Sequence, residues 1–282
     1  LFVVTLFVVG WLVSTFLKWI HILPSLGRVE ESISLITATA KEAMEKRYQN
    51  HFLGGQAMEG TTSGRYEVKA SRSGYIAAID LATLEASAQA MESPVYLAVS
   101  PGSWIYRGST LLYVDVLPDE KLCSRLRESF VVSAFRTYEQ DPRYGLVVLT
   151  EIGLKALSPG VNDPGTAIQV LAMQEQVLAI WARRQLEELP EVQYPHVYVQ
   201  GLVSADLFED AFSGMAHYGA GDFSVMLRLQ KTLLALFNQG DATFREAARE
   251  QSALALKRSS KADLLEEEQE RIAAVARQME IA

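Results

Sequence analysis

An uncharged apolar run opens the chain and limits what this end of it can become. Residues 1–17, LFVVTLFVVGWLVSTFL, carry no charged side chain. As a helix they span about 25 Å, against about 30 Å for the hydrocarbon core of a bilayer. The basic residues Lys18 and Arg28 follow the run instead of preceding it, which argues against a secretory signal peptide. We therefore predict the end of a transmembrane region over residues 1–20, with the C-terminal part of the chain cytoplasmic. Because the chain starts with Leu, we expect further membrane helices before it.

A helical pattern follows the apolar run after a break near Pro24. Apolar residues recur at spacings of three and four, as on one face of a helix: Leu26, Val29, Ile33, Ile36 and Ala40. The pattern predicts a juxtamembrane amphipathic helix within residues 21–53. Residues 54–64, GGQAMEGTTSG, are polar and rich in glycine, which is typical of a linker between domains.

Short alternating stretches predict a small β domain over residues 65–117. RYEVKASRSGYIAAID and PVYLAVSPGSWIYRGSTLLYVDV give strands separated by Pro-Gly and Gly turns, with LATLEASAQA as a short helix or turn between them. The rhythm of SGYIAAID and VSPGSWIYRGSTLLYV resembles the biotinyl/lipoyl-type barrel-sandwich hybrid fold. Such carrier domains need a modifiable lysine, and no lysine lies between Lys69 and Lys121. The resemblance therefore implies a barrel-sandwich-like module without a swinging-arm group.

The rest of the chain is expected to be mostly helical, as a domain over residues 118–240 and a charged helical tail over residues 241–282. PDEKLCSRLRESFVVSAF has an acidic first turn and predicts one amphipathic helix. QYPHVYVQG alternates and is consistent with a strand. In the tail, Ser260 and Asp263 have the spacing of a helix cap. The fold class predicted for the whole chain is an α+β membrane protein.

Charge and composition exclude several classes of function. The formal net charge is −8, whereas a nucleic-acid binder needs a basic face. The single cysteine, Cys123, cannot form an internal disulfide. The four histidines have no metal-ligand spacing, and no phosphate-binding or hydrolase motif is present. We expect no metal, no cofactor and no catalytic residue, and we regard enzymatic activity as the less favoured reading.

Three blocks of sequence together resemble one family. They are RTYEQDPRYGLVVLTEIGLKALSPGVNDPGTA, the SGYIAAID and PGSWIYRGSTLLYV block, and LFEDAFSGMAHYGAGDFSVMLRLQKTLLAL. They are similar to the uncharacterised bacterial membrane proteins catalogued as domain of unknown function 2254. The resemblance implies a location in the bacterial inner membrane, and it implies no mechanism.

The loop ALSPGVNDPGTA, residues 156–167, holds the candidate site. As a helix-capping turn, it would use Asp163 as the cap and Pro164 as the first helical residue. As a ligand site, it would present free helix N–H groups with Ser158, Asn162 and Thr166 to an anion. With Asp163 facing a cavity, it would instead hold a cation through oxygen atoms.

Upstream, Arg136 and Asp141 are weaker candidates for the same role, about one helix length from the loop. Arg136 and Glu139, one turn apart, have the spacing of a surface ion pair.

Three functions remain open on the sequence. The favoured one is a membrane-anchored protein whose cytosolic domain assembles into a homo-oligomer or binds a ligand or partner. The second is a channel or transporter subunit whose cytosolic part forms a vestibule or gate. The third is an enzyme that uses the Asn-Asp loop.

Overall fold

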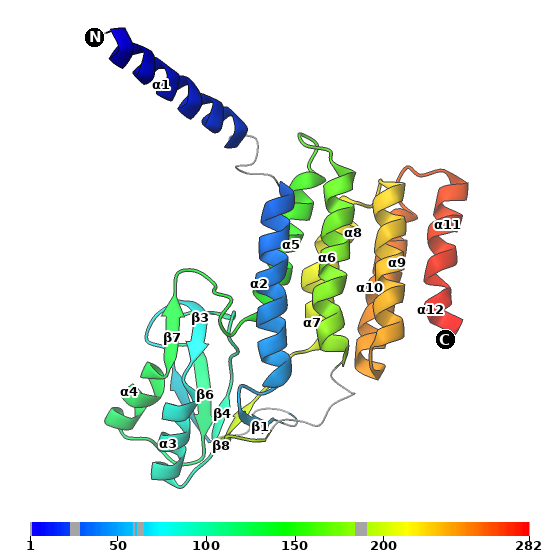
Figure 1. Cartoon of the computed structure of the whole chain (residues 1–282). Coiled ribbons are helices and arrows are strands. Elements are labelled where there is room, and N and C mark those ends of the chain that lie inside the picture. The colour runs from blue at the N-terminus through cyan, green and yellow to red at the C-terminus, as the bar shows by residue number, and fades with distance from the viewer. Residues whose placement is uncertain (1, 23–28, 59, 61–64, 184–190, 282) are drawn as a thin grey trace.

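The computed structural model of the chain describes residues 2–22, 29–58, 60, 65–183 and 191–281. It shows a helical unit standing beside a smaller β unit, with one further helix, α1, at the N-terminal end (Figure 1). The fold is mixed α+β. The expected break at Pro24, the basic residue Arg28 and part of the predicted linker (residues 59 and 61–64) lie outside the described residues.

Helix α1, Phe2–Ile22, covers the apolar run, and its described side chains are all exposed. Within the part of the chain that the structure describes, no helix combines the length and the apolar character needed to cross a bilayer. The predicted transmembrane helix is therefore wrong. The physical reason lies in the run itself, which ends at Lys18 after about 25 Å of helix, short of the hydrocarbon core.

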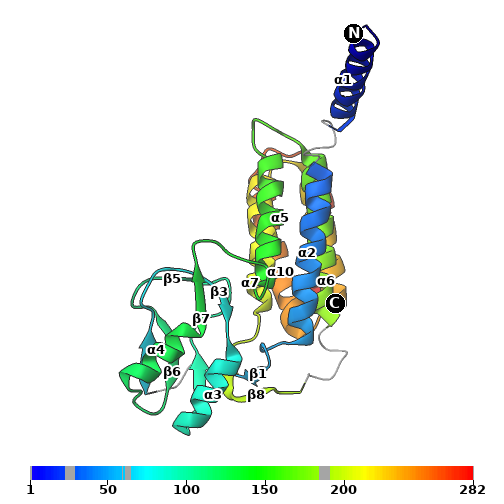
Figure 2. The same ribbon diagram turned by 60° about the vertical axis from the view of Figure 1, so that its left-hand side comes forward.

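The helical unit is built from long helices that pack side by side (Figures 1 and 2). Helix α2 contacts α5 and α6, α6 contacts α9, and α9 contacts α10 and α11. Their bounds are α2 Val29–Gln49, α5 Pro142–Ala156, α6 Pro164–Ala182, α9 Phe223–Gln239, α10 Ala242–Ser259, α11 Glu266–Ala276 and α12 Gln278–Ile281. Between α6 and α9 run two short helices, α7 Ser204–Phe208 and α8 Gly214–Tyr218, joined by one turn of π-helix, η2 Glu209–Ser213.

Aspartates start several of these helices by accepting a backbone N–H three residues on. Asp163, Asp222 and Asp241 do so at 3.1, 2.9 and 2.7 Å. Large apolar side chains then fill the space between the helices, among them Trp181, Phe208, Phe212, Phe237 and Phe244. The predicted cap at Ser260 and Asp263 is wrong, because α10 ends at Ser259 and α11 begins only at Glu266.

The β unit holds two open sheets. The larger has the order β1-β8-β4-β6-β2 and the smaller β5-β3-β7. The strands are β1 Gly55–Ala57, β2 Tyr66–Lys69, β3 Gly74–Ile79, β4 Val95–Leu97, β5 Trp104–Ile105, β6 Thr110–Val114, β7 Phe130–Ser133 and β8 Tyr194–Val199. Helices α3 Leu81–Met91 and α4 Glu120–Glu128 accompany them, and a second apolar core lies between these elements.

The predicted barrel-sandwich fold is wrong, since neither sheet closes into a barrel. Strand β8, which follows the helix α6, runs parallel to both β1 and β4 and so lies inside the larger sheet. Strand β7 pairs with β3 and extends the smaller sheet. Glycine and proline turns place strands along the sequence, but they do not choose partners that arrive from a distant part of the chain.

Three further expectations can be compared directly with the structure. The alternating stretch before residue 200 is confirmed as strand β8, and the segment after Asp80 is confirmed as helix α3. The single helix expected in PDEKLCSRLRESFVVSAF is wrong in its second half. There α4 stops at Glu128, and Phe130 begins strand β7.

A candidate ligand site where the helical and β units meet

The loop between α5 and α6 is a well-bonded capping turn. The Asp163 carboxylate accepts the Thr166 N–H at 3.1 Å and the Thr166 hydroxyl at 2.6 Å. Asn162 has a φ of 48°, in the left-handed region that asparagine tolerates. Ser158 donates its hydroxyl to the Lys155 carbonyl at 2.7 Å. These bonds satisfy the ends of both helices from within the loop.

The Asp163 carboxylate is turned toward its own helix. The hydrogen bonds from the Thr166 side chain and backbone hold the pKa of Asp163 below its ordinary value. The structure thus brings Ser158, Asn162, Asp163 and Thr166 into one turn at the surface. Binding of an anion or a cation by these four residues stays a prediction.

Arg136 and Asp141 lie elsewhere, at the other end of α5. That helix has 15 residues, which corresponds to roughly 22 Å. Figures 1 and 2 show the α5–α6 loop at the end of the helical unit away from the β unit. Arg136 donates two hydrogen bonds to the Asp141 carboxylate, at 2.7 and 3.0 Å. The expected surface pair with Glu139 is therefore wrong, because Arg136 is taken by Asp141.

Asp141 is enclosed on several sides. Only 1% of the residue is exposed, and its carboxylate makes no cap bond to α5. Gly102 lies against it: a Cβ atom built on Gly102 would come within 2.2 Å of Asp141 Oδ2. The φ of Gly102 is +86°, which glycine adopts without strain. The ion pair is thus closed over by the turn before β5.

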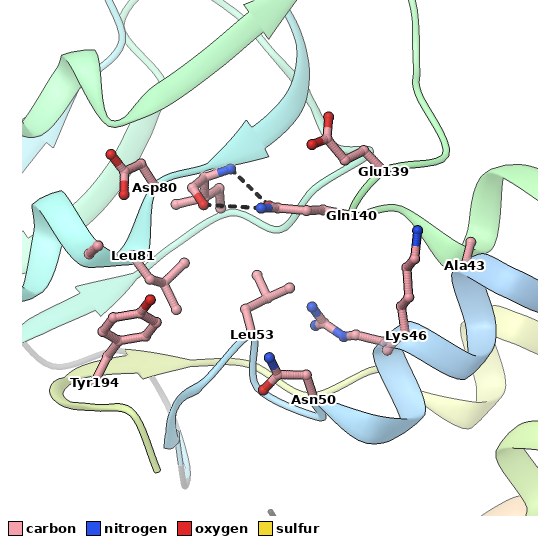
Figure 3. A pocket seen from close by; sticks show the side chains of 12 residues that line it. Ala43, Lys46, Asn50, Leu53, Asp80, Leu81, Glu139, Gln140 and Tyr194 are labelled. Carbon is pink, nitrogen blue, oxygen red and sulfur yellow. Dashed lines mark hydrogen bonds between the residues drawn. The ribbon is translucent and has the colours of Figure 1, made fainter. Parts of the chain in front are cut away.

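Two cavities open at the junction beside this pair. The first, of about 370 Å³, lies between the last turns of α2 and the segment of residues 79–82 (Figure 3). Gln140 crosses it and pairs with the backbone of Ile79, accepting its N–H at 2.9 Å and donating to its carbonyl at 3.2 Å. Lys46 and Asn50 line the α2 side, and Tyr194 closes the opposite side.

The second cavity, of about 300 Å³, is richer in arginine. Arg47, Arg136 and Arg143 all line it, together with the turn of residues 100–103 and the segment of residues 200–203. The two cavities share Arg47 and Gln140. These two side chains therefore stand between them.

Arg143 is tied to the π-helical turn. It donates to both carboxylate oxygens of Asp210 at 2.6 and 3.1 Å and to Asp206 at 2.7 Å. The Thr150 hydroxyl in turn donates to the Asp210 carbonyl at 2.7 Å. A π-helical turn is rare and is frequent at functional sites. Here it carries Asp210, which orients Arg143 toward the second cavity.

Arg47 differs from the other two arginines. The residue is only 4% exposed, and within the described part of the chain its Nε and Nη1 atoms have no hydrogen-bond partner. Burial lowers the pKa of Arg47 to about 10, with the charge of Asp141 acting in the opposite direction. The guanidinium is therefore still charged at neutral pH. A buried cation with free donors is rare in folded proteins.

Sequence reasoning missed Arg47, Gln140 and Arg143. A signal for Arg47 was present, since Ile33, Ala40 and Arg47 are spaced by seven and lie on the buried stripe of α2. An arginine on an apolar stripe is a reason to look for a buried charge. For Arg143 no local signal exists, because its partners lie more than sixty residues away.

Among the described residues, no three His, Cys, Asp or Glu side chains are grouped in a way that could hold a metal ion. The chemistry gathered at the junction consists of guanidinium, carboxylate, amide and hydroxyl groups. Such groups bind and orient polar ligands.

Comparison with known proteins gives a family and no activity. A family model described as "Predicted membrane protein (DUF2254)" matches residues 1–235. Uncharacterized proteins of Mycobacterium bovis and Mycobacterium tuberculosis are each 30% identical over 125 residues, which is 42% of this chain. The match covers 24% of the length of either relative. No solved structure matches this chain.

Proposed function

Because the chain belongs to the DUF2254 family of predicted membrane proteins, we propose that it is a part of a bacterial inner-membrane protein that binds a ligand where its helical and β units meet. The observation that carries this proposal is the pair of cavities that share Arg47 and Gln140. Cavities of this size are at the lower end of small-molecule sites, which lie preferentially between structural units.

Association with lipid is supported by α1. Its described side chains are apolar for the most part and exposed, for example Phe2 and Phe7 at 78% each. An apolar surface of this extent marks contact with a partner or with lipid.

Helix α2 connects this end to the junction. It begins at Val29 and carries Lys46 and Arg47 to the cavities, and Asn50 follows directly after its last residue. One rigid helix thus joins the end of the unit next to α1 to the place where the ligand binds. A change in the packing of the helical unit against the β unit would be transmitted along α2 to the end that lies next to α1.

Binding without catalysis is the role that the charges support. Arg136 is held by Asp141, and Arg143 is held by Asp206 and Asp210. Side chains locked in ion pairs position a ligand well, whereas proton transfer needs a group with a perturbed pKa within reach of a reacting atom.

Assembly into a homo-oligomer is supported by the edge of the smaller sheet. Strand β7 is an edge strand, and Val131 and Phe135 beside it are 53% and 77% exposed. An open, apolar strand edge is a ready surface for pairing with a second copy. Native mass spectrometry that finds only monomers, for the chain and for Phe135→Ser alike, would exclude this part of the proposal.

The central test is native mass spectrometry of the full chain purified in detergent. We expect a reproducible small-molecule mass on the protein, lost when Ser103→Trp fills the second cavity. Ala86→Trp is the matched control, because Ala86 is exposed on α3 and lines neither cavity. An adduct that survives Ser103→Trp contradicts binding in the second cavity, and a chain that carries no adduct when purified from cells contradicts binding at the junction.

A further inference from the structure

Resting on the proposed junction site, we infer that the ligand is a small soluble anion and that Arg47 is the residue that anchors it. The recognised group would be a phosphate or a carboxylate. The second cavity is the place, since Arg47, Arg136 and Arg143 line it together.

Arg47 has hydrogen-bonding capacity that the protein does not satisfy. Its Nε and Nη1 atoms are buried and lack a partner among the described residues. Both atoms carry N–H donors of a charged guanidinium, and such donors form strong hydrogen bonds to the oxygens of a carboxylate or phosphate. The Asp141 carboxylate, whose charge acts on Arg47, has both oxygens bound to Arg136. An anionic ligand would supply the acceptors that the protein does not.

The charged residues that line the two cavities differ, and they decide which cavity suits an anion better. The lining of the first includes the carboxylates Asp80 and Glu139, which repel an anion. The lining of the second includes one carboxylate, Asp206, and that group already accepts a hydrogen bond from Arg143 at 2.7 Å. Arg136 and Arg143 are already paired with Asp141, Asp206 and Asp210, so Arg47 is the arginine of the second cavity that an anion would neutralise.

Neutral donors complete the second cavity. The hydroxyl-bearing residues Ser100 and Ser103 come from the turn before β5, and Gln200 comes from the segment after β8. Hydroxyl and amide groups donate to phosphate and carboxylate oxygens. The cavity volume of about 300 Å³ suits a phosphate or carboxylate with a small organic part.

The position of Arg47 along α2 distinguishes a soluble anion from a lipid headgroup as the ligand. Arg47 lies 18 residues after Val29 on one helix, which corresponds to about 27 Å along α2. Figure 1 shows the last turn of α2 beside the β unit and its first turn at the opposite end, next to α1. If α1 contacts lipid, the site is too far from the surface for a headgroup to enter.

The test is calorimetric titration of the full chain in detergent with inorganic phosphate, pyrophosphate and citrate at constant ionic strength. We expect saturable binding of at least one of them. Arg47→Met should weaken it about tenfold or more, since a charge-assisted pair is lost. Arg47→Lys should fall in between, because a point charge replaces the fork. The control is Lys41→Met, which removes a charge from the same helix outside both cavities.

A second pair of variants keeps the test valid if Arg47→Met fails to fold. Ser103→Asp places a carboxylate in the second cavity, where it would pair with the arginines in place of the ligand. Ser103→Asn has nearly the same shape without the charge. We expect Ser103→Asp to bind the anion about tenfold or more weakly than Ser103→Asn.

Each outcome has one meaning. Absence of saturable binding of all three anions, or equal binding by Ser103→Asp and Ser103→Asn, overturns the inference. If vesicles of phosphatidylglycerol displace pyrophosphate and vesicles of phosphatidylcholine do not, the ligand is a lipid headgroup. The inference that the anion is soluble is then overturned. A neutral adduct that is lost in Ser103→Trp but kept in Arg47→Met would show that the ligand is not an anion. The proposed junction site would still stand.

Discussion

Two helices of this protein begin with the same dipeptide and use it differently. Asp141-Pro142 opens α5 and Asp163-Pro164 opens α6. The backbone angles of the two aspartates are nearly identical, with φ and ψ of −113° and 87° at Asp141 and −114° and 85° at Asp163. Yet Asp163 caps its own helix, whereas Asp141 makes no cap bond and pairs with Arg136 inside the protein.

The difference shows what the dipeptide decides and what it leaves open. Proline sets the first helical residue and restricts the residue before it, so the backbone comes out alike. The fate of the carboxylate depends on its surroundings. At Asp163 the nearest donors are those of its own helix, whereas at Asp141 the guanidinium of Arg136 outcompetes them because it is charged.

Loss of the Asp141 carboxylate should give the largest effect in this comparison. Asp141→Ala leaves Arg136 without its partner in a half-buried place and removes the negative charge that acts on Arg47. We expect a loss of about 3–5 kcal/mol in the free energy of unfolding. Urea unfolding of the full chain measures it. Asp163→Ala is the control, and an equal loss in both variants would break the distinction between the two aspartates.

Gly102→Ala should cost less, about 1–3 kcal/mol, since it combines a strained φ with a clash. Its new methyl group would meet the Asp141 carboxylate. In Asp141→Ala that carboxylate is gone, so the second substitution should cost clearly less there than in the native chain. A double-mutant cycle measures the coupling. Strictly additive losses would mean that Gly102 does not close over the ion pair.

The sequence predicted local features well, and it predicted the pairing of segments that lie far apart in the chain poorly. The alternation of Val197 and Val199 was enough to predict β8, and Asp163-Pro164 was enough to predict the start of α6. Strand β7 was missed because Ser129 alone separates it from α4, so the helical pattern seemed to continue. The barrel was wrong because β8 joins its sheet only after the chain has passed through α5 and α6.

The same distinction between local features and contacts of distant segments applies to the candidate site. The capping geometry of residues 158–166 follows from residue types at fixed spacing, and reading the sequence found it. Arg47 became a candidate only from the tertiary structure, in which α2 packs against α5 and α6 and the side chain is buried at the cavities. A charge on an apolar stripe is visible in the sequence, but whether a partner meets it depends on the tertiary structure.

The carboxylate of Asp163 should matter through its cap bonds alone, so its loss should be a small fraction of that caused by Asp141→Ala. Asp163→Asn keeps the shape and one acceptor oxygen, and Asp163→Ala removes both. We expect Asn to retain most of the stability that Ala loses. Thermal unfolding of the two variants measures this, and equal losses would mean that the charge rather than the cap holds the turn.

The smallest expected effect is the pH dependence of that cap. The hydrogen bonds from Thr166 lower the pKa of Asp163 in the folded chain, so the folded state releases the proton more readily than the unfolded state. Asp163 therefore stabilises the fold above its ordinary pKa, and this contribution is lost as the pH falls through the lowered value. The stability difference between the native chain and Asp163→Asn should be constant near neutral pH and shrink below about pH 4. Stability curves of both proteins between pH 3 and pH 7 measure it. A difference that grows in acid would mean that protonation favours the folded turn, contrary to a carboxylate that accepts from Thr166.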